Sequence, residues 1–346
     1  MNSQIKNKIN VELKKFAHSV DKRYAIDKIS PLLSKSIKDF ILRKGKRIRP
    51  SLFVISYLGF SKKTAAGLYQ SAIAFELVHD FLLVHDDIID KSDMRRNKPS
   101  MHTMLNGFLK RYKNVKFNGE DLAIVAGDVL HTMGIDTFLS IREDLNYKEK
   151  ALTCFNNAIM LTACGEFAEL LNGLKDLDKI TIRDIYKIYD YKTAHYTFSS
   201  PLCCGAILAG TNANQVNKLR AFGICLGRAF QIKDDILGMF GKENSIGKST
   251  TSDLQEAKKT LLIYYAYKHA NLKVKSKMKK ILSKQKVSKT DLKEIQEIIE
   301  KTGSLRHARQ EIVKFLKKSQ EIIVSCSMRP KYKNMLLSYL QPLLDS

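Results

Sequence analysis

Apolar residues recur every three or four positions along most of this chain, the spacing that places them on one face of an α-helix. Capping boxes begin two of the periodic segments, at Thr181 with Asp184 and at Ser288 with Asp291. The pattern predicts an all-α fold of about ten or more helices. The predicted helical segments are 33–42, 64–84, 121–141, 151–172, 182–209, 214–240, 258–272, 291–301, 305–325 and 330–344.

The composition agrees with a helical chain and shows no break between domains. The 346 residues include only 6 Pro and 17 Gly, and no Pro- or Ser-rich linker interrupts them. There is also no low-complexity tract and no repeat of solenoid period. The sequence therefore predicts one helical domain spanning residues 1–346.

The formal net charge of +24 indicates an anionic partner, such as a nucleic acid, a membrane surface or a phosphorylated small molecule. Lysine is densest at 268–289, which we interpret as a solvated helix face followed by a loop. No zinc-finger, RRM or KH signature accompanies the charge, so no nucleic-acid partner is expected. Peripheral association with a membrane stays open.

Cysteine usage and hydropathy favour a cytoplasmic location. The 6 Cys form no CxxC pair and no framework spacing, as expected of reduced thiols. The first residues are charged from Lys6 onward and lack the apolar core of a secretory signal. No run of about 18 apolar residues occurs, so no membrane-spanning helix is predicted.

The stretch FELVHDFLLVHDDIID (75–90) ends an apolar helix in acids. At about 100° per residue, Asp86 and Asp90 lie on one face of that helix. Neighbouring carboxylates are unfavourable to bury unless a cation neutralises them, and their oxygens suit Mg²⁺. The alternative is a solvated helix end whose acids pair with Arg95 and Arg96.

A second apolar helix ends in acids at Asp234 and Asp235, and Lys248 and Lys258 follow it. Two such helix ends are far less expected by chance than one. Together they predict Mg²⁺ ions held between two helices, with a diphosphate bridging the ions and Arg or Lys side chains binding its outer oxygens.

Five short motifs follow one another along the chain: GKRIRP (45–50), HDDIIDKSDMRR (85–96), YKTA (191–194), FQIKDDILG (230–238) and IGKSTTSDLQEAKKT (246–260). In this order they resemble the trans-prenyltransferases, or isoprenyl diphosphate synthases, over nearly the whole chain. Within that family the chain looks like the archaeal-type geranylgeranyl diphosphate synthases. The resemblance implies the isoprenoid synthase fold, a helical bundle around a central cavity.

The resemblance also implies a reaction. Isopentenyl diphosphate is condensed with an allylic diphosphate (dimethylallyl, geranyl or farnesyl) with the help of about three Mg²⁺ ions. The allylic diphosphate ionises, the double bond of isopentenyl diphosphate attacks the resulting cation, and a proton is lost. Such enzymes are expected to be homodimers.

The resemblance assigns roles to the polar side chains. The metal ligands are Asp86, Asp90 and Asp234, supported by Asp87 and Asp235. The allylic diphosphate is bound by Arg95, Lys192, Lys248 and Lys258. Isopentenyl diphosphate is bound by Lys46, Arg49, His79 and Arg96, with Arg47 assisting. The catalytic set is Lys192 with Thr193 and Gln231, whose oxygens stabilise the allylic cation.

The product length depends on which side chain blocks the growing hydrocarbon. Helical geometry nominates Leu82, one turn before Asp86, and then Phe75. The resemblance instead nominates Phe81, and Val78 completes the predicted set. We give the family pattern more weight because bundle helices bend. A single aromatic at Phe81 resembles the geranylgeranyl enzymes, so we predict a twenty-carbon product.

Three positions depart from the family pattern. Gly238 stands where some members have a third Asp, Asn97 replaces the Gly after the two arginines, and Ala257 replaces a Gly before Lys258. None of these changes removes an expected metal ligand.

Other functions stay in view. A farnesyl diphosphate synthase would share the motifs and differ in product length. A class I terpene cyclase would share the first acidic motif but has no reason to keep GKRIRP. A non-catalytic regulatory subunit of a heteromeric prenyl synthase would tolerate the loss of the acids, whereas this chain keeps both pairs.

Overall fold

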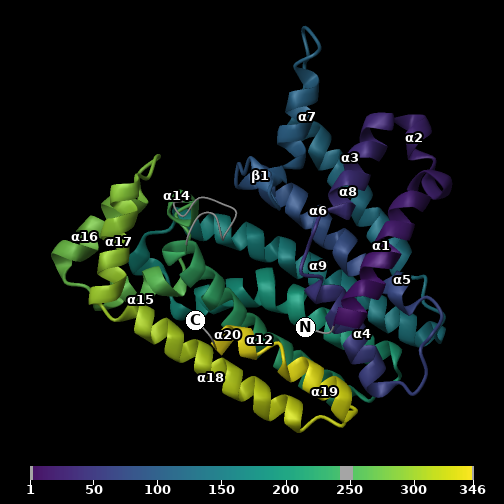
Figure 1. The fold of residues 1–346 in the computed structure, drawn as a ribbon. Coiled ribbons are helices and arrows are strands. Elements are labelled where there is room, and N and C mark those ends of the chain that lie inside the picture. Colours follow the sequence, from purple (N-terminus) through teal and green to yellow (C-terminus); the bar gives the residue numbers. More distant parts are fainter. Residues whose placement is uncertain (1–2, 242–251, 345–346) are drawn as a thin grey trace.

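The computed structural model describes residues 3–241 and 252–344, and these residues are almost wholly helical (Figure 1). Their β structure is a short antiparallel hairpin of β1 (Met94–Arg95) and β2 (Lys98–Pro99). The predicted all-α fold is confirmed. The helices are α1 (Ser3–Tyr24), α2 (Ile26–Ile29), α3 (Pro31–Leu42), α4 (Ile48–Phe60), α5 (Leu68–Ala72), α6 (Ala74–Ile89), α7 (Met101–Leu109), α8 (Gly119–Phe138), α9 (Leu145–Leu174), the 3₁₀ turn η1 (Leu177–Lys179), α10 (Ile182–Ile188), the π-helix η2 (Tyr189–Ser199), α11 (Ser200–Leu208), α12 (Ala213–Phe240), α14 (Ser252–Gln255), α15 (Leu261–His269), α16 (Leu272–Leu282), α17 (Lys289–Lys301), α18 (Ser304–Val324), α19 (Pro330–Leu337) and α20 (Gln341–Leu344).

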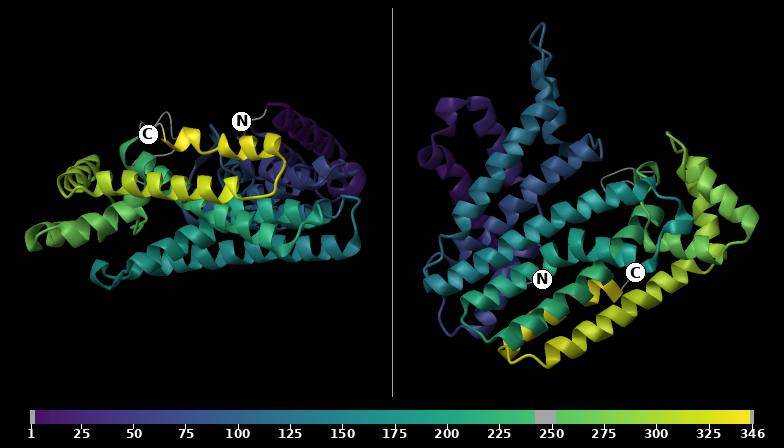
Figure 2. Two further views of the ribbon diagram at one scale, coloured as in Figure 1. Left: turned by 90° about the horizontal axis from the view of Figure 1, so that it is seen from below. Right: turned by 180° about the vertical axis from the view of Figure 1, so that it is seen from behind.

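The helices pack as a bundle in which α12 contacts many neighbours. It lies against η2 and α18, while η2 also packs on α9, and α6 lies along α8. Figures 1 and 2 show the long helices running side by side, with α16 and α17 at one end of the molecule. Buried hydrophobic residues from most of these helices form one core.

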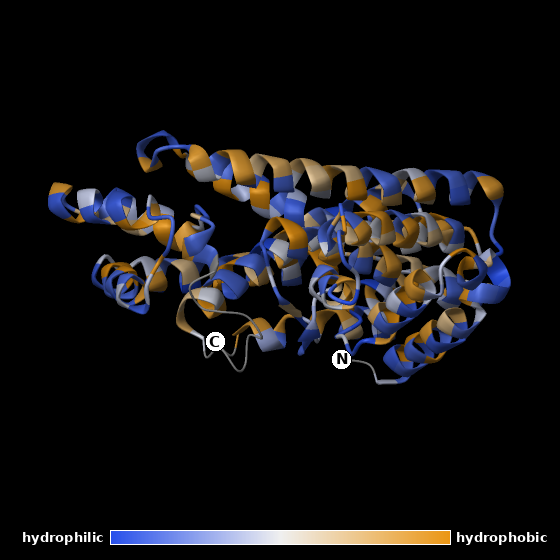
Figure 3. Cartoon of the chain, turned by 90° about the horizontal axis from the view of Figure 1, so that it is seen from above, coloured by the Kyte–Doolittle hydropathy of each residue, from blue (hydrophilic) through white to orange (hydrophobic). Residues whose placement is uncertain are grey.

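The amphipathic pattern of the sequence is visible on the fold. In Figure 3, hydrophilic and hydrophobic residues alternate along most helices, so that each can turn an apolar face inward. For example, α17 buries Leu292, Ile295 and Ile299. Among the described residues, no helix combines the length and the apolar character needed to cross a membrane.

Several helices lie outside the predicted segments, among them α1, α4 and α7. In α4 every residue from Pro50 to Gly59 is buried, so the helix lacks the polar face that produces a helical period. The predicted segment 64–84 is divided, because α5 ends at Ala72 and α6 begins at Ala74.

The predicted helix 182–209 changes type along its length, from α10 through the π-helix η2 to α11. Two glycines let neighbouring helices approach the wide η2 closely. A Cβ added to Gly165 of α9 would lie 2.8 Å from the backbone nitrogen of Lys192, and one added to Gly227 of α12 would lie 2.4 Å from the Ala194 Cα. Single π-helical turns are frequent at functional sites. Here η2 is held between α9 and α12 and carries Lys192.

Candidate active site

A cavity of about 620 Å³ lies beside the C-terminal ends of α6 and α12. The loop before α4, the β1–β2 hairpin, α9, η2 and residues 253–260 complete its wall. Most of the predicted metal-binding, diphosphate-binding and catalytic residues line it: Lys46, Arg47, Arg49, His79, Asp86, Asp90, Arg95, Arg96, Lys192, Thr193, Gln231, Asp234, Asp235 and Lys258.

The other predicted site residues lie elsewhere. Asp87 is fully buried. Lys248 lies outside the described residues. The predicted chain-length residues Val78, Phe81 and Leu82 sit on α6 but are not among the residues that line the described cavity.

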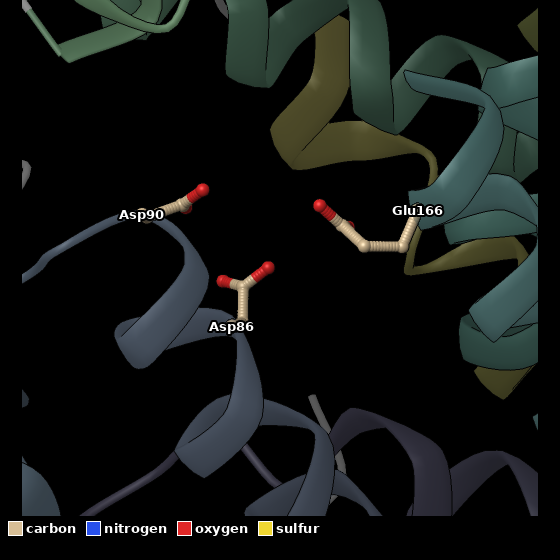
Figure 4. A group of neighbouring side chains, drawn as sticks. All are labelled: Asp86, Asp90 and Glu166. Carbon is tan, nitrogen blue, oxygen red and sulfur yellow. The ribbon is translucent and has the colours of Figure 1, made fainter. Parts of the chain in front are cut away.

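Three carboxylates meet at the C-terminal end of α6. Asp86 and Asp90 face Glu166 of α9, and their ligand oxygens lie within 4.8 Å of one another (Figure 4). Burial and the charge of Asp86 raise the pKa of Asp90, and burial raises the pKa of Glu166. A divalent cation with oxygen ligands would relieve this repulsion, so the three residues fit Mg²⁺.

The sequence pattern does not distinguish Glu166 from other acids. The available signal was a pair of acids, Glu166 and Glu169, one turn apart within the predicted helix 151–172. That pattern is common on solvated helix faces, and only the packing of α9 opposite α6 gives it meaning.

The ammonium group of Lys192 lies among the acids of two helices. Its Nζ is 2.5 Å from Oε2 of both Glu166 and Glu169, and 3.8 Å from Oδ1 of Asp86. Burial opposes the charge, but the carboxylates outweigh it and raise the pKa of Lys192 well above its ordinary value. Lys192 therefore stays protonated next to the three-carboxylate group.

A chain of hydrogen bonds links the predicted catalytic residues to the second acidic motif. Thr193 Oγ1 donates to Gln231 Oε1 at 2.5 Å, and Gln231 Nε2 donates to Asp235 Oδ1 at 2.9 Å. The Tyr189 hydroxyl donates to the other oxygen of Asp235. Burial raises the pKa of Asp235 to about 8. Asp235 is thus a buried anchor for Gln231, whereas the neighbouring Asp234 is exposed in the cavity.

Residues 253–258 bring further charges to the same cavity. Lys258 Nζ lies 2.5 Å from Glu256 Oε2 and 3.8 Å from Asp90 Oδ2. A Cβ added to Gly238 would lie 2.4 Å from Asp253 Oδ2. The Asp253 carboxylate therefore occupies the space beside Gly238. This is the position where some isoprenyl diphosphate synthases, the family that the motifs resemble, have a third Asp.

Arg95 pairs mainly with the buried acid of the first motif. Its Nε donates to Asp87 Oδ1 at 2.7 Å, and its Nη2 lies 3.5 Å from Asp86 Oδ2. The ion pairing considered as an alternative is thus present in part. It involves Asp87, which leaves Asp86 and Asp90 facing the cavity.

The guanidinium of Arg47 is buried, and each of its three nitrogens donates a hydrogen bond. It donates to Asn10 Oδ1 at 3.1 Å, to Glu76 Oε1 at 2.5 Å and to the Arg43 carbonyl at 2.7 Å. Its backbone is left-handed, with φ 57°, which is uncommon for a residue with a side chain. These bonds suit Arg47 to holding Glu76 in place.

Arg96 rests on two buried acids. Its Nη1 is 3.1 Å from Asp80 Oδ1, and its Nη2 is 3.4 Å from Glu76 Oε1. Asp80 is fully buried, and neither of its oxygens has a hydrogen bond of good geometry among the described residues. Burial raises the pKa of Asp80 to about 7. Arg96 and Glu76 both line the cavity, whereas Asp80 is not among its lining residues.

Arg49 and His79 share an aromatic neighbour beside Arg96. The Arg49 guanidinium lies 4.5 Å from the centre of the Tyr196 ring and donates to Thr197 Oγ1 at 2.8 Å. The His79 ring lies 6.2 Å from the same Tyr196 ring. Burial, together with nearby arginines, lowers the pKa of His79 well below its ordinary value. His79 is therefore a neutral hydrogen-bonding group.

The Phe81 ring lies between two histidines. Its centre is 4.7 Å from that of His85 and 5.0 Å from that of His131 on α8. Phe75 lies deeper, in a cluster with other phenylalanines of the core. On α6 the apolar residue lining the described cavity is Leu83. The assignment of Phe81 as the floor stays a prediction.

Both non-glycine departures from the family pattern adopt the conformation that glycine favours. Asn97 has φ 59° and Ala257 has φ 51°. Asn tolerates the left-handed region, whereas Ala is strained there. Each residue adjoins a cation of the cavity, Arg96 or Lys258.

Relatives with known names match nearly the whole chain. The family model described as Polyprenyl synthetase matches residues 30–299. Geranylgeranyl diphosphate synthase of Saccharolobus solfataricus is 31% identical over 342 residues, covering 98% of this chain and 94% of that protein. The protein of the same name from Sulfolobus acidocaldarius is 33% identical over 298 residues, covering 86% of this chain and 85% of its own.

The fold also matches solved structures. The crystal structure of a geranylgeranyl pyrophosphate synthase from Corynebacterium glutamicum, complexed with isoprenyl diphosphate and magnesium, superposes with a TM-score of 0.89. The match covers 100% of this chain and 99% of the other at 22% identity. The family resemblance of the five motifs is thereby confirmed, and the chain belongs to the polyprenyl synthetase family.

Proposed function

We propose that the protein condenses isopentenyl diphosphate with an allylic diphosphate in a Mg²⁺-dependent, head-to-tail reaction and that its product is geranylgeranyl diphosphate. One observation carries the proposal: Asp86, Asp90 and Asp234, at the ends of two different helices, line one cavity together with the cations that two diphosphates need. The names of the archaeal relatives support the same reaction and product.

Asp86, Asp90 and Asp234 would hold Mg²⁺, and Glu166 would add a further carboxylate. About three ions are expected from the family pattern. When bound, Mg²⁺ neutralises the charge that builds up on the departing diphosphate. Asp87 and Asp235 act behind the ligands, since they fix Arg95 and Gln231.

The cations divide into two sets. Arg95, Lys192 and Lys258 bind the allylic diphosphate from the side of the metal ligands, and Lys248 belongs to the same set by resemblance. Lys46, Arg49, His79 and Arg96 bind isopentenyl diphosphate, whose diphosphate is not released. Arg47 assists by fixing Glu76.

The carbon chemistry needs a dry pocket without a nucleophile. Thr193 and Gln231 turn oxygens toward one another beside Lys192, and Leu83 and Phe230 supply apolar wall. Their oxygens stabilise the allylic cation without attacking it. The departing diphosphate, held by the cations, accepts the proton that is lost from the condensed product.

A homodimer is proposed because α8 and α9 expose apolar side chains. Ile124 and Val125 of α8 are 43% and 56% exposed, and Phe167 and Leu174 of α9 are 67% and 85% exposed. Large exposed apolar patches mark protein interfaces. Sedimentation velocity of the purified chain would give a dimer, and Phe167→Glu would shift it toward the monomer.

The reaction is tested with purified protein, Mg²⁺, radiolabelled isopentenyl diphosphate and each allylic diphosphate in turn. The products are dephosphorylated and the alcohols separated by chromatography. Geranylgeraniol supports the full proposal, and farnesol alone would indicate a farnesyl diphosphate synthase. The absence of any elongated product would contradict the proposed reaction and favour a regulatory subunit, which would then change the activity or the product of a catalytic partner chain.

A further inference from the structure

A helical hairpin projects from the bundle between α7 and α8 (Figures 1 and 2). We call its loop, residues 110–118, the α7–α8 tip. Every residue of the tip except Val115 is exposed. Only the short β1–β2 hairpin separates α6 from α7. The helical hairpin of α7 and α8 therefore leaves the bundle near the C-terminal end of α6, where the acids of the cavity lie. The tip is therefore a protrusion at the cavity end of the molecule.

The tip carries unbalanced positive charge. Its cations are Lys110, Arg111, Lys113 and Lys116, and no Asp or Glu occurs between Asp93 and Glu120. Within the described part of the chain, none of the four cations lies within ion-pair distance of a carboxylate. A cation without an acidic neighbour is free to contact an external anion.

The lysine-rich segment around α16 offers a contrast. There Lys279 pairs with Asp176 and Asp178, and Lys277 pairs with Glu294. Part of its charge is thus neutralised within the protein. Among the residues that the structure describes, the cations of the α7–α8 tip have no such partners, and the tip stands away from the bundle.

Two exposed aromatic rings accompany the cations of the tip. Tyr112 is 59% exposed and Phe117 is 52% exposed. The Tyr112 ring lies 5.6 Å from that of Phe108, and the Arg111 guanidinium lies 5.5 Å from the centre of the Phe108 ring. Exposed aromatics among Lys and Arg suit the boundary between lipid headgroups and acyl chains.

We propose that the α7–α8 tip docks the protein on a bilayer that contains anionic lipids. The four cations contact headgroup phosphates, and Tyr112 and Phe117 enter the boundary of the acyl chains. A nucleic acid fits less well, because its sites spread cations along a face or groove, whereas these lie on one convex tip. The inference rests on the tip and is independent of the proposed reaction.

Vesicle flotation with the full chain tests the proposal. The wild type should float with vesicles of phosphatidylcholine and phosphatidylglycerol but not with phosphatidylcholine alone. A tip variant that changes Lys110, Arg111, Lys113 and Lys116 to Gln should lose roughly 100-fold in partitioning. The matched control removes four exposed lysines near α16 by changing Lys273, Lys280, Lys286 and Lys289 to Gln, and it should lose less than about three-fold.

Tryptophan fluorescence gives a second test that needs no loss of charge. The chain contains no Trp, so Phe117→Trp places a single reporter at the tip. Its emission should shift to shorter wavelength with anionic vesicles, whereas Leu272→Trp, a control at an 85% exposed position on α16, should not shift. Both variants should keep wild-type activity with short, water-soluble substrates.

Three results would overturn the proposal. One is a wild type that ignores anionic vesicles, and another is a control variant that loses binding as strongly as the tip variant. The third is duplex DNA that binds the tip and displaces the vesicles, which would identify a nucleic-acid surface instead.

Discussion

The two halves of the cavity differ in how their acids and cations are arranged. In the metal half, the carboxylates of Asp86, Asp90 and Glu166 converge on one another, and Arg95, which lines the cavity, donates to the buried Asp87. In the arginine half, formed by Lys46, Arg49 and Arg96, the cations line the cavity, and the fully buried Asp80 lies behind Arg96, while the buried Glu76 contributes to the cavity wall beside it.

This difference matches two ways of holding a diphosphate. Carboxylates in front require metal ions between them and an anion, and the metal then stabilises a leaving group as well as binding it. Arginines in front bind the anion directly, and the acids behind fix their orientation. The proposed reaction needs one diphosphate that leaves and one that stays, so each half suits one substrate.

The largest expected effect comes from removing a front carboxylate of the metal half. Asp86→Asn should lower kcat by roughly a thousand-fold, since the stabilisation of the leaving group is lost. Initial rates with saturating substrates measure it, and circular dichroism checks the fold. A kcat within about ten-fold of the wild type would contradict the assignment of Asp86 as a metal ligand.

The structure adds Glu166 to the metal half, and this addition can be tested without turnover. Glu166→Gln should weaken Mn²⁺ binding by roughly ten-fold or more, measured by electron paramagnetic resonance. Glu169→Gln is the matched control, because Glu169 also pairs with Lys192 but lies outside the three-carboxylate group. Equal weakening in both variants would show that Lys192, and not direct ligation, controls metal affinity.

The arginine half is tested through the acid behind it. Asp80→Asn removes the carboxylate that positions Arg96, so the KM for isopentenyl diphosphate should rise by roughly ten-fold while the KM for the allylic substrate changes little. Asp93→Asn, an exposed acid after the same helix, is the control. A larger effect on the KM for the allylic substrate would contradict the assignment of Arg96 to isopentenyl diphosphate.

The same variant carries a prediction for pH. Burial raises the pKa of Asp80 from 3.8 to about 7, so the unfolded chain releases this proton at lower pH than the folded protein does. The wild type should therefore lose stability from this group as pH rises through that interval, and the loss should end above it. Asp80→Asn lacks this carboxyl group. As pH rises through the same interval, its Tm, measured by scanning calorimetry, should therefore fall less than that of the wild type.

The contrast between the halves was only partly predictable from the sequence. The front residues Asp86, Asp90, Asp234 and Arg96 stand in motifs whose order along the chain indicates their roles. The local period of α6 also places Asp86 and Asp90 together, because that relation depends on one helix alone.

The positions of the supporting residues, by contrast, depend on tertiary packing. Glu166 acquires its place only because α9 faces α6, and nothing in its own segment distinguishes it from a solvated acid. Arg47 lies in a motif with Lys46 and Arg49, yet its left-handed backbone and its bonds to Glu76 bury it. Sequence patterns report side-chain chemistry and period, but not which of several adjacent cations turns inward.

Product length is a smaller, qualitative test of which side chain blocks the hydrocarbon as it grows away from the metal half. Phe81→Ala should lengthen the product by one or two isoprene units, seen by chromatography of the dephosphorylated alcohols, because it removes the ring between His85 and His131. Leu82→Ala tests the competing argument from helical geometry. An unchanged product in Phe81→Ala with a longer one in Leu82→Ala would identify Leu82 as the floor.

The smallest expected effect concerns the two left-handed turns, one in each half. Ala257, before Lys258 of the metal half, has φ 51°, and the strain of Ala in that region exceeds the extra chain entropy that Gly loses on folding. Ala257→Gly should therefore raise the free energy of unfolding by about 0.5–1 kcal/mol in urea titrations. Asn97→Gly, after Arg96 of the arginine half, should change it by only a few tenths of a kcal/mol, roughly, since Asn tolerates this region. If Ala257→Gly instead destabilises the protein, contacts of the Ala257 methyl group outweigh the strain, and the family's preference for Gly there would need another cause, such as movement of Lys258 when diphosphate binds.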